Sequence, residues 1–252
     1  SYDKLTSLDK WALGRLAELS DKVTQAYDEF QFHIVFHAVH NFCAVDMSAL
    51  YLDILKDRLY CDAKESQSRK AAQTVLYEIT KNLVPLFAPI IPHTADEVYN
   101  YLPGEKEESV FLAGWPTIKP EFRNKELMEE YEKKLELRDA VLKVLETARA
   151  DKKIGQSLEA TVWLKAQDAE TENWLQDILP DLKGLFIVSE VKLGEFPGEI
   201  VTEFPELKVS VGFSEAEGKK CERCWNYSTT VGSDTEYPDV CERCSTVLKE
   251  RN

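Results

Sequence analysis

Apolar residues recur every three or four positions along the first hundred residues, which is the spacing of an amphipathic helix. Strand-like alternation is absent from this segment. Thr6 and Asp9 have the spacing of a capping box at a helix start, and three prolines crowd residues 85–92, where they interrupt helical hydrogen bonding. The pattern therefore predicts helices over the ranges 6–30, 32–60, 67–88 and 93–102.

The second half of the chain has a mixed pattern. Residues 109–116 look extended, and a long charged helix is predicted at about 123–150. Beyond it, the sequence predicts strands at 159–165, 186–193 and 207–213, with a helix near 168–179. These elements are typical of a small α+β module. We therefore divide the chain into a helical segment over 1–120, a connecting helix with the α+β module over 121–218, and a cysteine-rich tail over 219–252.

The tail carries two CxxC pairs separated by sixteen residues, Cys221 with Cys224 and Cys241 with Cys244. This spacing is typical of a site in which four thiolates hold one zinc ion in a closed tetrahedron. No position is left open for water, so such a zinc would be structural and not catalytic. Two disulfides or a redox-active pair are the alternatives, and reduced cytosolic thiols favour zinc.

An aromatic residue and two arginines flank these cysteines. Trp225 directly follows Cys224, while Arg223 and Arg243 lie within the two CxxC pairs. A rigid aromatic face can stack on an unpaired base, and a guanidinium can pair with phosphate, so the group predicts a reader of single-stranded RNA. The alternative is that Trp225 packs over the small core of the cysteine motif itself.

Three histidines share one predicted helix face at spacings of four and three residues: His33, His37 and His40. The spacing suggests a metal site, but Ile34 follows His33 where the HExxH motif has its glutamate. We interpret these residues as a polar helix face. The interleaved apolar residues are expected to make core contacts: Phe32, Phe36 and Val39.

The composition limits the possible partners. The 252 residues include 31 Lys and Arg against 45 Asp and Glu, which gives a net charge of -14. This charge argues against a uniformly basic nucleic-acid-binding surface and favours a protein-interaction module as the alternative function. The excess of acidic residues is unevenly distributed, because residues 154–218 carry 13 acidic and 4 basic residues. No apolar run or secretory signal indicates a membrane protein, so we expect a soluble, cytoplasmic monomer. The first residue is not methionine, which suggests a piece of a longer protein.

Several segments match the motifs of a known family: Asp9 to Trp11, Tyr51 to Tyr60, Ala88 to Val98, Ser109 to Pro116, Ala148 to Ala160 and Cys221 to Trp225. Together they resemble the C-terminal region of bacterial isoleucyl-tRNA synthetases, which are class I aminoacyl-tRNA synthetases. The first and third segments are shared with valyl and leucyl relatives. The second segment and the cysteine motif indicate the isoleucine enzyme.

The resemblance implies a mainly α protein: a helical-bundle anticodon-binding domain, a small α+β junction domain and a four-cysteine zinc knuckle. The full-length enzyme uses ATP to attach isoleucine to its tRNA, on a domain with HIGH and KMSKS motifs that this chain lacks. We therefore expect no catalytic residue here, isoleucine tRNA as the partner, and neither DNA nor membrane binding.

The resemblance also suggests where RNA would lie. Anticodon bases are expected near Arg223 and Trp225, and phosphates along basic side chains: Lys56, Arg58, Arg149, Lys152 and Lys153. A solvated helix face is the alternative for the lysines. Gly155 is expected to end the long helix in a left-handed conformation and so to hold Lys152 and Lys153 on a fixed turn.

Overall fold

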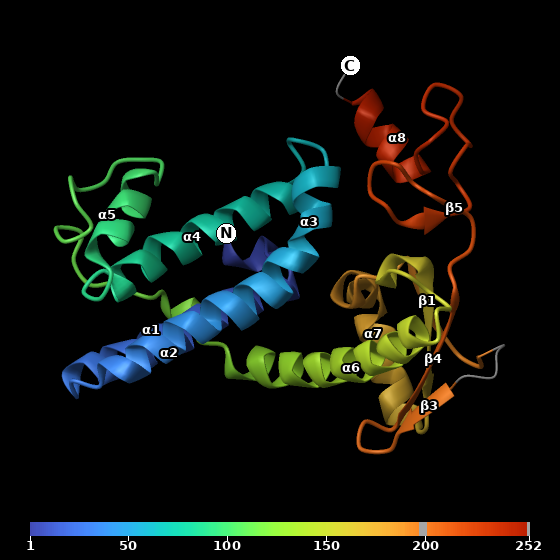
Figure 1. Ribbon diagram of the computed structural model, residues 1–252, viewed down its shortest axis with the longest axis horizontal. Helices are drawn as coiled ribbons and strands as arrows, with labels where there is room; N and C mark the ends of the chain where they lie inside the picture. Colours follow the sequence, from blue (N-terminus) through green and yellow to red (C-terminus); the bar gives the residue numbers. More distant parts are fainter. Residues whose placement is uncertain (197–200, 251–252) are drawn as a thin grey trace. The chain divides into compact units, whose positions relative to one another are not determined.

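The computed structural model describes residues 1–196 and 201–250 and groups the chain into two compact units, Ser1–Tyr131 and Glu132–Asn252 (Figure 1). The first unit is helical, and the second combines helices, a small sheet and the cysteine-rich tail. The mainly α fold class predicted from the sequence is confirmed. The division into segments 1–120, 121–218 and 219–252 stays a prediction.

The helices of the first unit follow the predicted ranges closely. They are α1 (Ser7–Asp28), α2 (Phe32–Asn41), a π-helix (Phe42–Tyr51), α3 (Leu52–Cys61), α4 (Gln67–Phe87) and α5 (Pro92–Asn100), with short 3-10 turns at Tyr2–Lys4 and Pro120–Phe122. The capping box at the start of α1 is present, since the N–H of Asp9 donates to Oγ1 of Thr6 at 3.2 Å and the N–H of Thr6 donates to Asp9.

The core of the first unit lies along α1, which packs against both α2 and α4 (Figure 1). The periodic apolar residues that predicted α1 line this core and are buried: Leu8, Ala12, Leu16, Leu19 and Val23. Burial of this stripe supplies the main driving force for the bundle. The stripe ends before Phe30, whose side chain is 79% exposed.

Residues 109–113 form a turn and no strand occurs within 109–116, so the extended structure predicted there is wrong. The N–H of Leu112 donates to the carbonyl of Ser109 at 3.0 Å, and the N–H of Ala113 donates to the carbonyl of Val110 at 3.3 Å. The carboxylate of Asp96, on α5, accepts hydrogen bonds from the Ser109 hydroxyl at 2.7 Å and from the Val110 N–H at 3.0 Å. Because the Val110 N–H is bonded to the side chain of Asp96, it is not available to pair with the backbone of a neighbouring strand.

Helix α6 (Lys125–Ala150) begins in the first unit and continues into the second, where a four-stranded mixed sheet follows. The strands are β1 (Ala160–Ala166), β2 (Glu190–Leu193), β3 (Val201–Phe204) and β4 (Val209–Glu215), arranged in the order β2-β1-β4-β3. Strand β1 runs parallel to β2 and antiparallel to β4. Strand β3, which the sequence pattern did not predict, pairs antiparallel with β4.

Helix α7 (Ala169–Phe186) connects β1 to β2 and contacts both strands. It is longer than predicted, because it continues through Pro180 to Phe186, which is fully buried. Ile187 ends the helix in a left-handed conformation with φ +55°, so the next strand begins at Glu190 and not at 186. None of the helices in the described parts of the chain combines the length and the apolar character of a membrane span.

Candidate metal centre and nucleic-acid interface

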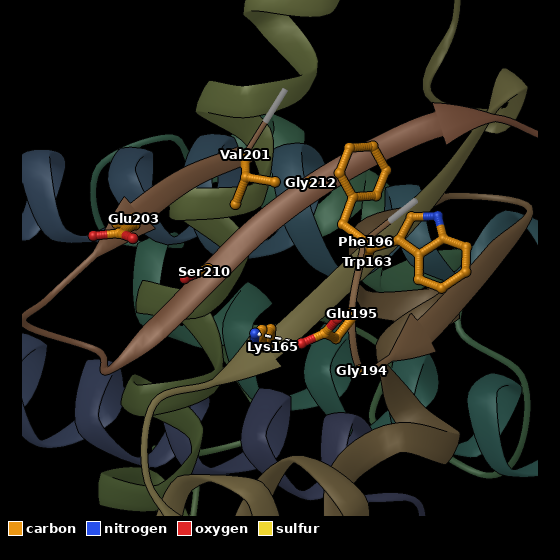
Figure 2. A pocket seen from close by; sticks show the side chains of 9 residues that line it. All are labelled: Trp163, Lys165, Gly194, Glu195, Phe196, Val201, Glu203, Ser210 and Gly212. Carbon is orange, nitrogen blue, oxygen red and sulfur yellow. Dashed lines mark hydrogen bonds and ion pairs between the residues drawn. The ribbon is translucent and has the colours of Figure 1, made fainter. Parts of the chain in front are cut away.

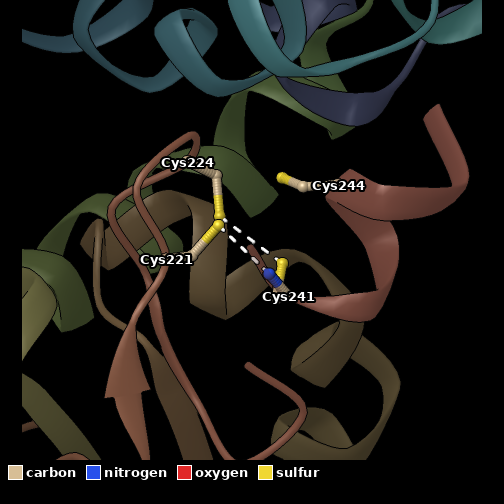
Figure 3. A group of neighbouring side chains, drawn as sticks. All are labelled: Cys221, Cys224, Cys241 and Cys244. Atoms are coloured by element: carbon tan, nitrogen blue, oxygen red, sulfur yellow. Dashed lines mark hydrogen bonds between the residues drawn. The ribbon is translucent and has the colours of Figure 1, made fainter. Parts of the chain in front are cut away.

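The four cysteines of the tail converge on one point (Figure 3). Their sulfur atoms all lie within 4.8 Å of one another, and the Sγ atoms of Cys224 and Cys241 are 3.8 Å apart. A tetrahedral zinc site with zinc–sulfur bonds of about 2.3 Å places neighbouring sulfurs about 3.8 Å apart. The cluster therefore fits one zinc ion, whereas two separate disulfides would not need all four sulfurs to meet.

The first cysteine pair is positioned by a short hairpin, β5 (Lys219–Lys220) and β6 (Tyr227–Ser228). Gly218 precedes it with φ +91°, and a Cβ at this position would lie 2.2 Å from the carbonyl carbon of Ser228. Only glycine fits such a close approach of two backbones. The hairpin is tied to the residue that directly precedes β2, because the N–H of Tyr227 donates to Oγ of Ser189 at 2.7 Å.

The second pair lies at the start of helix α8 (Glu242–Lys249). Cys241 is the N-cap residue and donates its backbone N–H to Sγ of Cys221 at 3.3 Å, while Cys244 lies in the first turn. A helix N-terminus stabilises negative charge, but burial raises the pKa of the Cys241 thiol, so its place at the N-cap does not by itself make it a thiolate. A small cluster of apolar residues packs around the buried cysteines: Val231, Tyr237, Val240 and Leu248.

Hydrogen bonding prepares the cluster to carry negative charge. A hydrogen bond from the Cys244 thiol, with others from the Asn226 backbone and Arg243, lowers the pKa of Cys224 to about 4. The same bond raises the pKa of Cys244, which acts as the donor. The Nη1 atom of Arg223 lies 3.5 Å from Sγ of Cys244.

Trp225 lies on the rim of the cluster with its ring exposed. The side chain is 57% exposed and the residue has φ +64°, a left-handed conformation that is rare for a bulky side chain. Nζ of Lys220 lies 5.3 Å from the centre of the indole ring. This exposure argues against the alternative in which Trp225 packs over the core of the motif, and the base-stacking role of Trp225 stays a prediction. Lys220, which sequence reasoning missed, could have been found from the Lys219-Lys220 pair directly before Cys221.

A second basic group lies at the end of α6, in the turn that holds Lys152 and Lys153. Lys152 has φ +58°, its N–H donates to the carbonyl of Arg149, and the N–H of Lys153 donates to the carbonyl of Ala148. These two bonds form a Schellman motif. The left-handed residue is thus Lys152, so the expectation that Gly155 ends the helix in this conformation is wrong. The fixed turn expected to hold Lys152 and Lys153 is present. Both lysines are exposed.

Arg149 is partly engaged near this turn, since its Nη2 donates to Oγ of Ser157 at 2.8 Å. In the first unit, Lys56 pairs with Asp53 at 2.6 Å and is mostly exposed. Arg58 differs from both, because its guanidinium donates to Asp9, Thr6 and Ser68. Its donors are occupied within the protein, so the phosphate contact predicted for Arg58 is wrong.

The three histidines of α2 are exposed, as expected for a polar helix face. Among the described residues, the four cysteines are the one group of three or more potential ligands close enough to hold a metal ion. The metal-site alternative for the histidines has no support. The core contacts predicted for Phe32 and Phe36 are wrong, since these side chains are 51% and 56% exposed.

A cavity of about 240 Å³ lies on the sheet of the second unit (Figure 2). Its lining includes Trp163, Phe196 and Glu203, together with Lys165, which pairs with Glu195 at 3.0 Å. The lining also includes Ser210, and none of the site residues predicted from the sequence lies among the residues that form it.

Comparison with known proteins relates these features to two families. Residues 9–164 match the family described as the anticodon-binding domain of tRNA ligase. Residues 218–247 match the zinc finger found in FPG and IleRS, which covers all four cysteines. The first match covers more than half of the chain, and the second agrees with the geometry of the cysteine cluster.

Individual relatives share sequence along nearly the whole chain. The isoleucine–tRNA ligase of Moorella thermoacetica is 47% identical over 98% of this chain, that of Syntrophotalea carbinolica is 45% identical over 99%, and that of Geobacter sulfurreducens is 43% identical over 98%. The chain spans 27% of the length of each of these relatives. With its helical first unit and its four-cysteine tail, the chain belongs to the family of anticodon-binding domains of tRNA ligases.

Proposed function

We propose that this chain is the tRNA-binding end of an isoleucine–tRNA ligase and that it contacts the anticodon region of isoleucine tRNA. The observation that carries the proposal is the presence of both family matches in one chain whose relatives are isoleucine–tRNA ligases. Attachment of isoleucine with ATP belongs to the parts of those relatives that this chain does not span. The chain alone binds RNA and catalyses nothing.

Zinc bonded to Cys221, Cys224, Cys241 and Cys244 would fix the two CxxC turns against each other. The residues between the cysteines then have one orientation. Lys220 lies over the ring of Trp225, and the exposed part of the ring can stack on an unpaired base. Because the turn is already ordered, little conformational entropy is lost when the base binds.

Basic side chains around the cysteine cluster, at the end of α6 and on α3 would bind phosphates. The set consists of Lys56, Arg149, Lys152, Lys153, Lys220, Arg223 and Arg243. The two arginines beside the cysteines already lie against sulfur atoms, so they would approach RNA in fixed positions. We also keep the predictions of a monomer in the cytoplasm that binds neither DNA nor membranes.

The test replaces Trp225 and measures binding to an RNA hairpin with the anticodon loop of isoleucine tRNA. Trp225→Ala should weaken binding by about 1–3 kcal/mol, or about 5- to 150-fold, while Trp225→Phe should keep most of the affinity. Zinc content should stay at one ion per chain in both variants. Unchanged affinity of a zinc-loaded Trp225→Ala protein would contradict the stacking role.

The net charge of -14 favours a second candidate, a zinc-containing module that binds protein and not RNA. The two functions differ in their response to salt. Contacts to phosphate release counterions, so RNA affinity should fall steeply between about 50 and 200 mM salt. An apolar protein interface changes little over this range. Weak binding that is equal for related and unrelated hairpins would favour the second candidate.

A further inference from the structure

An exposed group of rings lies where α1 turns into α2. We call it the α2 aromatic surface and define it as Phe30, Phe32, Phe36, His37 and His40. The three phenylalanine side chains are 79%, 51% and 56% exposed, in chain order. The Phe36 ring stacks on His40 at 5.9 Å between ring centres and meets the edge of His37 at 5.3 Å. Phe30 and Phe32 contact edge to face at 6.3 Å. The rings thus support one another without being buried.

Phe30 is held in a strained conformation. It has φ +56° and occupies the left-handed position of a Schellman motif, because its N–H donates to the carbonyl of Tyr27 and the N–H of Gln31 donates to the carbonyl of Ala26. Glycine is the usual residue there, because the Cβ of any other residue is crowded in this left-handed conformation. The exposed ring offsets little of this steric cost by burial.

Trp225 resembles Phe30 in combining a left-handed backbone with an exposed ring, since it has φ +64° and a side chain that is 57% exposed. Among the described residues, Phe30 and Trp225 are the two aromatic residues with positive φ. Each presents a ring to solvent from a turn that would be more stable with glycine. The geometry points to the same ligand chemistry at both places, a flat π-face that stacks on each ring.

The charges around the α2 aromatic surface favour bases over phosphates. No lysine or arginine occurs between Lys22 and Lys56, and the exposed carboxylates of Asp28 and Glu29 directly precede the surface. Carboxylates repel phosphate but accept hydrogen bonds from the amino groups of bases. Imidazole nitrogens can bind base edges in the same way. The surface lies inside residues 9–164, which match the anticodon-binding family.

We propose that the α2 aromatic surface binds unpaired nucleobases of the RNA, as a second stacking site besides Trp225. This inference rests on the proposed function and adds a base-binding site that involves no zinc.

The test uses the whole chain with the same RNA hairpin, carrying 2-aminopurine at single loop positions, so that stacking changes its fluorescence. Phe30→Gly is the decisive variant, because it relieves the strained turn while it removes the ring. We expect thermal stability to be kept or raised and RNA affinity to fall by about 5-fold or more. If Phe30 had a purely structural role, RNA affinity would fall only together with thermal stability.

Phe36 tests the chemistry of the surface. Phe36→Leu keeps apolar area but removes the π-face, so it should weaken RNA binding, whereas Phe36→Tyr should restore it. Tyr101→Ala is the matched control, since Tyr101 is 83% exposed in the same unit but outside the surface. Unchanged binding in Phe30→Gly and Phe36→Leu, with a clear loss in Trp225→Ala, would overturn the inference alone. Absence of hairpin binding by the unaltered chain would overturn the proposed function as well.

Discussion

Arg58 and Asp9 form a bidentate ion pair that joins α3 to α1, with Nη1 2.9 Å and Nη2 2.8 Å from the two carboxylate oxygens. Asp9 is fully buried, and it also accepts a hydrogen bond of 2.8 Å from the hydroxyl of Tyr51. Burial and the neighbouring carboxylate raise the pKa of Tyr51, so its hydroxyl keeps its proton. Arg58 therefore stabilises the fold of the first unit.

Removing one partner of this pair should destabilise the first unit. Arg58→Met leaves the Asp9 carboxylate buried without its counter-charge, and we expect a loss of about 3–5 kcal/mol in unfolding free energy. Hydrogen exchange of the α1 and α3 amides measures the change for this unit separately. Lys56→Met is the control, because Lys56 makes an exposed pair on the same helix and should leave exchange unchanged. Equal protection in both variants would show that the buried pair is not stabilising.

Zinc removal should unfold the tail and leave the first unit intact. The apolar cluster around the cysteines is small, so the metal–sulfur bonds supply most of its stability. We expect one zinc per chain by elemental analysis, and loss of ordered amide signals from residues 218–247 after chelation. Cys244→Ser should lose the metal, whereas Cys43→Ser, which lies outside the cluster, should retain it. A second tightly bound zinc would contradict this assignment.

Lys152→Gly should raise the stability of the α6 terminus and lower RNA affinity. Glycine adopts φ +58° without the steric cost of a Cβ, which is worth up to about 1 kcal/mol, while the loss of the ammonium group removes a phosphate contact. Gly155→Ala is the comparison. Gly155 is not in a left-handed conformation, and its added Cβ would meet Glu159 Oε2 at 3.4 Å, so we expect a small effect. Chemical denaturation and hairpin binding measure the two quantities; a Lys152→Gly protein with unchanged affinity would remove this lysine from the RNA-binding set.

The turn at residues 109–113 should loosen in acid. Hydrogen bonds from Ser109 and from the Val110 N–H lower the pKa of Asp96 below its ordinary value. The unfolded chain therefore binds the proton more readily, so this stabilisation is present above about pH 4 and is lost as the pH falls further through the lowered pKa. Hydrogen exchange at Val110 as a function of pH, corrected for intrinsic exchange rates, measures it. Asp96→Asn should remove the dependence, and a variant that kept it would point to another carboxylate.

Local sequence determined much of the architecture. The buried stripe of α1 follows from the spacing of Leu8, Leu16 and Val23, because side chains three and four positions apart share one face of a helix. The capping box of Thr6 and Asp9 depends on residues three positions apart. The two CxxC pairs indicated the metal cluster for the same reason, since each tight turn brings its own pair of sulfurs together.

Tertiary structure decided the features that depend on distant partners. The ion pair with Asp9 makes Arg58 a structural residue, whereas its charge alone had suggested an RNA contact. The carboxylate of Asp96 accepts hydrogen bonds from the turn that begins at Ser109 and so stabilises it. The exposure of Phe36 depends on where α1 and α4 leave α2 uncovered, which periodicity does not report. Helix α6 is followed by a left-handed residue at Lys152 and not at Gly155, because the N–H groups of Lys152 and Lys153 bond to the carbonyls of Arg149 and Ala148. Spacing along a chain determines which side chains share a face, but burial and charge depend on what the fold places against that face.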